Sequence, residues 1–228
     1  MCVEGVFLKN LNSLLEVQMI NEKLPHHTEF ETKYRVNSDL IFKFKSIVSE
    51  LDYKNFVYAE GPDYYYTKPD GSFLRYRKAT TEKRAEVTLK EKPSNAKHNV
   101  ERKEINWRVD ATPKEVIHEG ALMMGFTFNF SIWKSCHIYN FKDATLVFYT
   151  VRDDSNKLDH FVEIELDENN IHNLTLQQAW DKIRNYEEIL SPLGITHRHR
   201  LTKSLYEMYV KDINYGEKLI ESGIAKNS

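Results

Sequence analysis

The sequence predicts an α+β protein built on a closed antiparallel β-barrel with helices on its outer side. Three observations favour this fold. The 228 residues include 13 Tyr and 12 Phe, which are enriched in strands, but only 8 Gly and 6 Pro. Several segments alternate charged and apolar residues with the period of two that a strand imposes. Three further segments have apolar residues at helical spacing, each with a start signal, and they can cover the apolar faces of the strands.

The first predicted helix spans residues 37–51 and begins at Asn37 or Ser38. Its apolar residues from Leu40 to Leu51 recur on one face. The second predicted helix is capped by Thr112, has Pro113 at its first position and a capping box closed by Glu115, and ends near Gly125. Both helices therefore have an apolar face to bury against a sheet.

The third predicted helix repeats the capping box with Thr175 and Gln178 and stops at Ser191-Pro192-Leu193-Gly194. The strands between the helices are joined by segments typical of turns. We expect hairpin turns at residues 68–71, where Lys-Pro-Asp-Gly separates two aromatic runs, and at residues 140–143 and 154–157.

One face of strand after strand is densely charged. A single strand of this kind is typical of a solvated sheet face. Here, however, Glu-x-Glu pairs occur near both ends of the fold, with Arg and Lys pairs between them. We therefore expect the charged faces to converge inside a barrel of about eight strands, whose interior holds side chains or one small ligand. The charged faces are those of Glu29, Glu31, Lys33 and Arg35; of Arg75 and Arg77; of Glu86, Thr88 and Lys90; and of Glu163 and Glu165.

Charges inside a barrel are costly unless a ligand or metal neutralises them. Paired carboxylates offer the oxygen ligands that Mg²⁺ and Mn²⁺ prefer, and these ions usually combine few carboxylates with phosphate oxygens. Arg and Lys side chains would hold the remaining phosphate charge. The pattern thus predicts a polyphosphate ligand bound with a divalent cation.

Composition and charge exclude some classes of function. The net charge of −2, with 29% charged residues, provides no overall electrostatic surface for nucleic acid or for an anionic membrane. Cys2 and Cys136 are too few for a disulfide framework, which favours a reducing compartment, and we expect the cytosol. We expect no signal peptide in the first twenty residues, which lack a basic start followed by an apolar run, and no stretch long enough to span a bilayer. We expect an accessory segment over residues 1–25, one domain over 26–212 and a tail over 213–228.

Over about residues 26–209 the sequence resembles the CYTH domain, also called the triphosphate tunnel metalloenzymes. The family's mark is Glu-x-Glu-x-Lys, and HTEFETKYRV has it at Glu29, Glu31 and Lys33. The succession that follows is similar as well: FLRYR, TLKEKP, ERKEIN, Trp133-Lys134, Asp153 and the closing FVEIE. The resemblance implies an eight-stranded antiparallel tunnel flanked by helices.

The resemblance also implies roles for particular residues. Mg²⁺ or Mn²⁺ would be held by Glu29, Glu31, Glu163 and Glu165, with Asp153 as a further ligand or a residue that positions water. Lys33 and Asp153 would take part in the reaction. The phosphates would be bound by Lys33, Arg75, Arg77, Lys90, Arg102 and Lys134, and by Arg200 and Lys203 near a basic C-terminal helix that closes the tunnel.

The sequence also departs from the family pattern at two positions. Cys136 stands where an Arg is common after Lys134, and Asn106 stands where a third acidic residue often follows Glu104. These departures motivate the alternative of a nucleotide-binding module that has lost turnover.

The resemblance favours hydrolysis of a triphosphate. The substrate would be inorganic triphosphate, a nucleoside or thiamine triphosphate, or the 5′ triphosphate end of RNA. A class IV adenylyl cyclase and a nucleotide-binding module without turnover are the alternatives. We expect a monomer or a homodimer without a membrane partner.

Overall fold

The structure, a computed structural model, describes residues 28–80, 84–91, 101–110, 113–167 and 171–212. The strands are β1 (Thr28–Val36), β2 (Asn55–Thr67), β3 (Phe73–Arg77), β4 (Ala85–Lys90), β5 (Glu101–Val109), β6 (Thr127–Asn140), β7 (Ala144–Arg152) and β8 (Leu158–Leu166). The helices are α2 (Leu40–Ser49), α3 (Lys114–Met123), α5 (Leu176–Leu190) and α6 (Leu205–Tyr209), with two 3₁₀ turns at Ser191–Leu193 and His197–His199.

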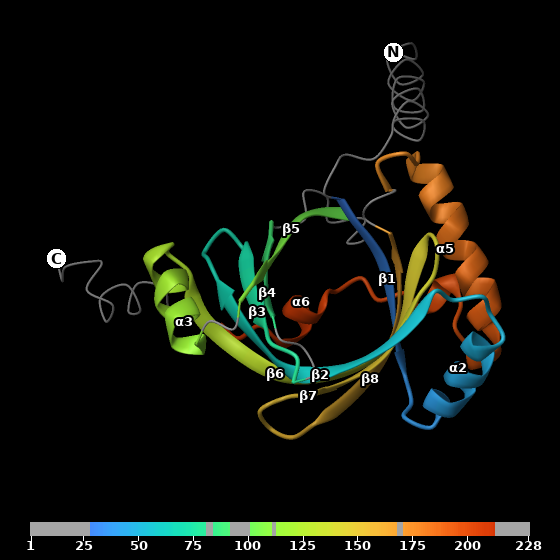
Figure 1. Ribbon diagram of the computed structural model, residues 1–228, viewed down its shortest axis with the longest axis horizontal. Coiled ribbons are helices and arrows are strands. Elements are labelled where there is room, and N and C mark those ends of the chain that lie inside the picture. Colours follow the sequence, from blue (N-terminus) through green and yellow to red (C-terminus); the bar gives the residue numbers. More distant parts are fainter. Residues whose placement is uncertain (1–27, 81–83, 92–100, 111–112, 168–170, 213–228) are drawn as a thin grey trace, which may run out of the picture.

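All eight strands belong to one antiparallel, strongly curled sheet (Figure 1). The hydrogen-bonded order is β1-β5-β4-β3-β2-β6-β7-β8, and β1 also pairs with β8, so the order returns to its starting strand. The predicted eight antiparallel strands and the α+β class are confirmed.

The two ends of the sheet meet at a short seam along β1. Six positions of β1, from Glu31 to Val36, pair with β8, whereas only three, from Thr28 to Phe30, pair with β5. Beyond this seam the described part of β5 pairs with β4 alone. The sheet is therefore a half-barrel over most of its length, joined through a few residues rather than along a full ladder as the predicted tunnel requires.

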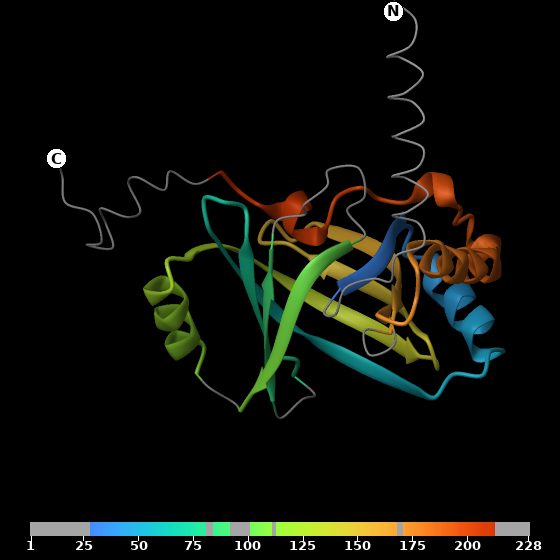
Figure 2. The same cartoon turned by 90° about the horizontal axis from the view of Figure 1, so that it is seen from above.

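The helices cover the convex side of the sheet at two places (Figures 1 and 2). Helices α2 and α5 cover β1, β7 and β8, where Phe44 and Ile183 pack among the apolar residues of those strands. Helix α3 covers β3 and β4, and its Ala121 packs with Tyr76 and Val87. Burying one such side chain contributes about 1.5–3 kcal/mol. Because the apolar faces are covered from outside, the charged faces must point to the concave side.

The helix starts follow the predictions to different degrees. Helix α5 begins as predicted, with both hydrogen bonds of the capping box between Thr175 and Gln178, and ends before Gly194, which has a φ of 76°. Helix α2 begins later than predicted, and its cap residue Asp39 makes no side-chain cap hydrogen bond. Helix α3 has Pro113 as its cap residue rather than its first helical residue, and Thr112 lies outside the described residues.

The three predicted hairpin turns are confirmed. They join β2 to β3, β6 to β7 and β7 to β8. In the first, the amide of Gly71 donates to the carbonyl of Lys68 at 3.0 Å, and Gly71 adopts a φ of 84°. In the third, Asn156 adopts a φ of 64°, a conformation that Asn tolerates better than most residues.

The ends of the predicted domain division, residues 1–25 and 213–228, lie outside the described residues. Within the described ranges no helix combines the length and the apolar character needed to cross a bilayer.

Candidate functional site

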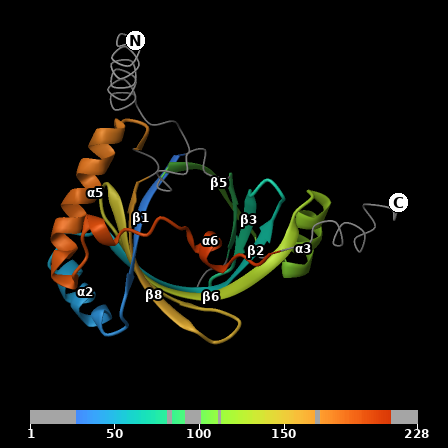
Figure 3. The ribbon, with the colours of Figure 1, turned by 180° about the vertical axis from the view of Figure 1, so that it is seen from behind.

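The concave side of the sheet encloses a cavity of about 540 Å³. Helix α6 lies across one mouth of the curled sheet (Figure 3), and Ser204, Leu205 and Tyr206 form part of the wall. The predicted convergence of the charged strand faces is confirmed except at Arg35, which is half-exposed, pairs with Asp159 and does not line the cavity. The charged residues that line the cavity include Glu29, Glu31, Lys33, Arg75, Arg77, Glu86, Lys90, Glu104, Lys134, Glu163 and Glu165.

One end of the cavity is acidic, and Lys33 lies at its centre. Its Nζ is 2.9 Å from Glu31 Oε1 and 3.0 Å from Glu163 Oε2. Lys33 and Glu163 are directly opposite each other on β1 and β8, so strand register sets this contact. Burial alone would lower the pKa of Lys33, but Glu163 and Glu31 outweigh burial and raise it above its ordinary value. Lys33 is therefore a buried ammonium group held between two carboxylates.

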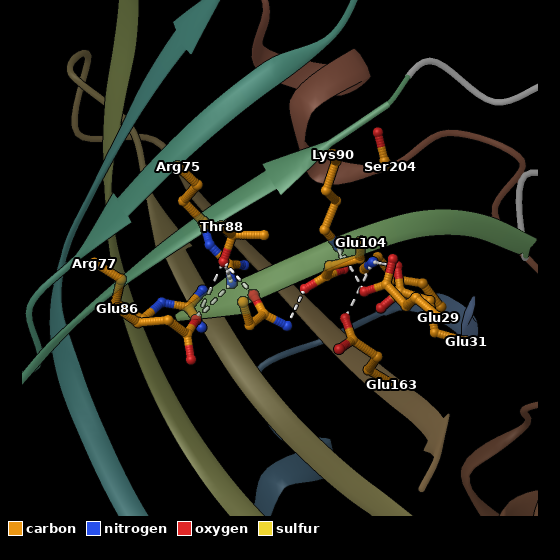
Figure 4. A network of polar contacts seen from close by, with 12 residues as sticks. Glu29, Glu31, Arg75, Arg77, Glu86, Thr88, Lys90, Glu104, Glu163 and Ser204 are labelled. Atoms are coloured by element: carbon orange, nitrogen blue, oxygen red, sulfur yellow. Dashed lines mark hydrogen bonds and ion pairs between the residues drawn. The ribbon is translucent and has the colours of Figure 1, made fainter. Parts of the chain in front are cut away.

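Lys90 repeats this arrangement with two other carboxylates of the acidic end (Figure 4). Its Nζ lies 2.5 Å from Glu29 Oε1 and 2.5 Å from Glu104 Oε2. Its pKa is raised because Glu29 and Glu104 outweigh the effect of burial, which would lower it. For Glu104, burial alone would raise the pKa, but Lys90 and Arg75 outweigh it and lower the pKa to about 2. Each buried lysine of the acidic end thus bridges two strands.

The acidic end still has an excess of negative charge. Five carboxylates, those of Glu29, Glu31, Glu104, Glu163 and Glu165, meet the two ammonium groups of Lys33 and Lys90. Burial, followed by Glu163 and Glu31, raises the pKa of Glu165 to about 8. Burial and Glu31 likewise raise the pKa of Glu29. Without another cation, the excess charge is relieved by protonation.

A divalent cation fits the chemistry of this acidic end. Oxygen-only donors are the set that Mg²⁺ and Mn²⁺ prefer. The Oε2 atom of Glu29 is buried and accepts no hydrogen bond from the described residues. Such an oxygen can serve as a ligand for a cation. As the side chains now stand, the described residues gather no three His, Cys, Asp or Glu side chains around one ion-sized point. The donor set is present, while two lysines occupy its oxygens.

The other end of the cavity is basic (Figure 4). Arg75 Nη2 donates to Glu86 Oε1 at 2.8 Å and to Thr88 Oγ1 at 2.9 Å. The Nε–H of Arg75 is buried without an acceptor among the described residues. Arg77 is held by Asp63, with which it forms an ion pair at 2.6 Å. This buried Nε–H group can donate a hydrogen bond to an anion, just as the free oxygen of Glu29 can bind a cation.

Lys134 is a further cation of the cavity. Its side chain is buried, and its Nζ lies 3.9 Å from the centroid of the Tyr149 ring. Among the described residues, no carboxylate lies within ion-pair distance of this ammonium group. Lys134 can therefore contact an anion without first breaking an ion pair.

Three residues predicted for the site lie elsewhere. Asp153 is in the exposed turn between β7 and β8, where its Oδ1 accepts hydrogen bonds from Ser155 and Lys157, and it does not line the cavity with the predicted metal ligands. Arg200 donates two hydrogen bonds to Glu187, at 2.6 and 2.7 Å, on the convex side. Lys203 is exposed and does not line the cavity. Helix α6, which lies across one mouth of the sheet, begins only at Leu205, so Arg200 and Lys203 lie before it rather than in it.

Arg102 lies opposite Glu29 in the seam between β1 and β5, but its side chain lies outside what the structure describes. Asn106 stands where the family often has an acidic residue. Its Nδ2 donates a hydrogen bond to Glu104 Oε1 at 2.7 Å, and its side-chain oxygen accepts one from Thr88. Cys136, which stands where the family commonly has an Arg, is a buried free thiol packed with Tyr149. Both departures are accommodated by contacts inside the sheet.

Sequence reasoning placed Glu86 on a charged face expected inside the barrel but gave it no role, and it assigned no role to Asp63 or Glu104. The signal was present for Glu104, because it shares a strand face with the predicted phosphate ligand Arg102. Asp63 had no such signal. It lies in a run of aromatic residues, and only its register opposite Arg77 reveals its role.

Comparisons with known proteins agree with this geometry. Residues 27–197 match the CYTH domain. The PH1012 protein of Pyrococcus horikoshii has a similar structure, with a TM-score of 0.60, 26% identity and coverage of 80% of this chain and 99% of its own. HpAC1 of Hippeastrum, an adenylyl cyclase candidate with a dominant triphosphatase activity, has a TM-score of 0.53, 14% identity and coverage of 86% and 96%.

The triphosphatase of the Mimivirus capping enzyme also has a similar fold, with a TM-score of 0.53, 12% identity and coverage of 80% of this chain and 97% of its own. No match to the sequence was found among curated proteins.

Proposed function

The chain belongs to the CYTH domain family, and from this premise we propose that it is a divalent-metal-dependent hydrolase that cleaves a phosphoanhydride bond of a triphosphate. The observation that carries the proposal is the separation of charge inside one cavity. Glu29, Glu31 and Glu163 gather with other carboxylates at one end, while Arg75 and Arg77 lie at the other. A metal-bound polyphosphate is the ligand that complements both ends.

The basic end would bind the phosphate chain. Lys134 is available without breaking an ion pair, and the Nε–H of Arg75 has no acceptor among the described residues. Arg77 keeps three N–H donors free of Asp63, since a guanidinium has five and Asp63 takes two. The cavity of about 540 Å³ is in the size range of small-molecule sites. The seam between β1 and β5 would complete a tunnel around the substrate.

The acidic end would hold the metal through Glu29, Glu31, Glu163 and Glu165. What a bound Mg²⁺ or Mn²⁺ supplies there is neutralisation of the charge that develops on the transferring phosphoryl group. Lys33, which lies among these carboxylates, would add a further positive charge at the same place. The walls of the sheet would exclude bulk water, so these charges act at a low local dielectric constant.

Two proteins of similar fold support hydrolysis. HpAC1 of Hippeastrum has a dominant triphosphatase activity, and the Mimivirus protein is the triphosphatase of a capping enzyme. Hydrolysis also needs no nucleoside pocket, whereas a cyclase must place a ribose hydroxyl against the α-phosphate. We therefore propose inorganic triphosphate, a nucleoside or thiamine triphosphate, or the 5′ triphosphate of RNA as substrate classes.

The test is product separation after incubation with each triphosphate and either Mg²⁺ or Mn²⁺. Release of phosphate or pyrophosphate from at least one substrate, lost on chelation, is the expected result. Formation of cyclic AMP and pyrophosphate from ATP would overturn the proposal in favour of a cyclase. Tight binding of a triphosphate without any product would overturn it in favour of a binding module.

A further inference from the structure

The two buried lysines of the acidic end occupy carboxylate oxygens that a metal would need. Lys33 lies between Glu31 and Glu163, and Lys90 lies between Glu29 and Glu104. The four contacts range from 2.5 to 3.0 Å, and all six side chains are at most 12% exposed. An ammonium group at these distances repels a divalent cation bound to the same carboxylate and neutralises part of the charge that attracts it.

We propose that Lys33 and Lys90 are internal counter-ions that compete with the divalent cation for the carboxylates, and that they are released to the phosphate chain when a triphosphate enters. The inference rests on the proposed function, since it concerns the same metal and the same substrate class. In this proposal the two lysines couple metal binding to triphosphate binding, and they also contribute positive charge to the site.

The physical basis is the exchange of partners within a closed set of charges. With the cavity free of phosphate, each lysine prevents the high cost of buried unpaired carboxylates. A triphosphate offers these ammonium groups new anionic oxygens in the same cavity. The carboxylates are then free to hold the cation. Each ligand therefore favours the other, and thermodynamic linkage makes the two effects equal.

Lysine is suited to this exchange and arginine is not. Its ammonium group is a compact charge on a flexible four-carbon stem, so it can turn from one acceptor to another. The two arginines of the basic end are instead held in place, Arg75 by Glu86 and Thr88 and Arg77 by Asp63. The cavity thus combines fixed guanidinium groups with two ammonium groups that can exchange partners.

Binding of Mn²⁺ alone, measured by the electron paramagnetic resonance signal of the free ion, tests the proposal without turnover. Lys33→Met and Lys90→Met each remove one ammonium group and release two carboxylates, and should bind Mn²⁺ roughly tenfold or more tightly than the unchanged protein. Lys134→Met is the matched control. It removes the same charge from the same cavity but releases no carboxylate, and it should change the Mn²⁺ affinity by less than about threefold.

Thermal unfolding with and without Mn²⁺ provides a second readout. Without metal, Lys33→Met and Lys90→Met should each have a lower melting temperature than the unchanged protein. Mn²⁺ should raise the melting temperature of each variant by more than it raises that of the unchanged protein. If only one of the two variants folds, that variant alone decides the test. Unchanged Mn²⁺ affinity in a folded variant, or an equal gain in Lys134→Met, would overturn the inference.

The two proposals fail in different ways. If the unchanged protein cleaves a triphosphate with Mn²⁺ but Lys33→Met and Lys90→Met bind the ion no better, the exchange is overturned and the function stands. If both variants gain Mn²⁺ affinity but no triphosphate is cleaved, the function is overturned and the competition for carboxylates stands.

Discussion

Arg77 and Asp63 lie directly opposite each other on neighbouring strands, and the guanidinium of Arg77 donates to both carboxylate oxygens of Asp63, at 2.7 and 2.6 Å. Asp63 is fully buried. Burial would raise its pKa, but Arg77 outweighs that effect and lowers it. Asp63 is therefore ionised at neutral pH and fixes the orientation of an arginine that faces the cavity.

This pair predicts that Asp63→Asn will impair substrate binding more than the chemical step. Asn accepts fewer hydrogen bonds and carries no charge, so Arg77 loses its fixed orientation. We expect KM for the triphosphate to rise about tenfold with kcat within about threefold, and stability to fall by roughly 2 kcal/mol. Steady-state kinetics and urea unfolding measure both. A purely structural role would lower stability and leave KM unchanged, which would contradict the positioning role.

Glu163→Gln should abolish metal-dependent turnover. The substitution keeps the shape of the side chain but removes one of the carboxylates proposed to hold the metal. We expect kcat to fall by at least about 100-fold, because several kcal/mol of charge stabilisation depend on the cation. Glu31→Ala should have an effect of the same order. Circular dichroism should show that both variants remain folded.

Asp153→Asn is the matched control for those two variants. It also removes one carboxylate charge, but in the exposed turn where Asp153 accepts hydrogen bonds from Ser155 and Lys157. We expect kcat and KM within about twofold of the unchanged protein. A loss of turnover comparable to that of Glu163→Gln would show that the metal ligands have been placed wrongly.

Lys134→Met should weaken triphosphate binding because it removes a buried cation that has no carboxylate partner among the described residues. Loss of one charge-assisted contact corresponds to a rise in KM of about tenfold or more. Lys203→Met provides the comparison, since Lys203 is exposed and outside the cavity. Equal effects of the two substitutions would reject the assignment of Lys134 and restore the original prediction for Lys203.

Glu187 predicts an acid-sensitive contribution to stability. It is buried and accepts hydrogen bonds from Arg200 and from the hydroxyl of Tyr34. Burial raises its pKa, but Arg200 and Tyr34 outweigh burial and lower it below its ordinary value of 4.5. A lowered folded-state pKa means that the contribution is present above the unfolded-state pKa and is lost as the pH falls through the folded-state value.

Unfolding by urea at a series of pH values measures this contribution. We expect Glu187→Gln to lower stability by about 1–3 kcal/mol at pH 7 and to reduce the loss of stability below about pH 4.5. Glu188→Gln, an exposed neighbour on the same helix, serves as control. If the stability of Glu187→Gln depends on pH as that of the unchanged protein does, then other carboxylates determine the loss of stability at low pH.

The composition of the cavity could be predicted from sequence because it depends on local periodicity. Side chains two residues apart point to the same face of a strand, so Glu29, Glu31 and Lys33 had to share one face. The start of α5 was predictable for the same reason, since Thr175 and Gln178 are three residues apart and bond within one turn. Both patterns need no information from distant parts of the chain.

Long-range register could not be predicted in this way. The resemblance to the family placed Asp153 in the site, yet the turn between β7 and β8 takes it away from the cavity. The resemblance predicted that Arg200 binds phosphate near a basic helix. Instead, Arg200 donates a hydrogen bond to Glu187, and its guanidinium lies 4.4 Å from the centroid of the Trp180 ring. Each of these contacts depends on where two elements meet after the sheet has curled.

The sequence by itself determined which side chains face inward, because the period of a strand is a property of the local backbone. Only the tertiary structure decided which charges meet: Lys33 with Glu163, Lys90 with Glu29 and Glu104, and Arg77 with Asp63. These pairs are set by strand register and by the closure of β1 between β5 and β8, which are cooperative properties of the whole sheet.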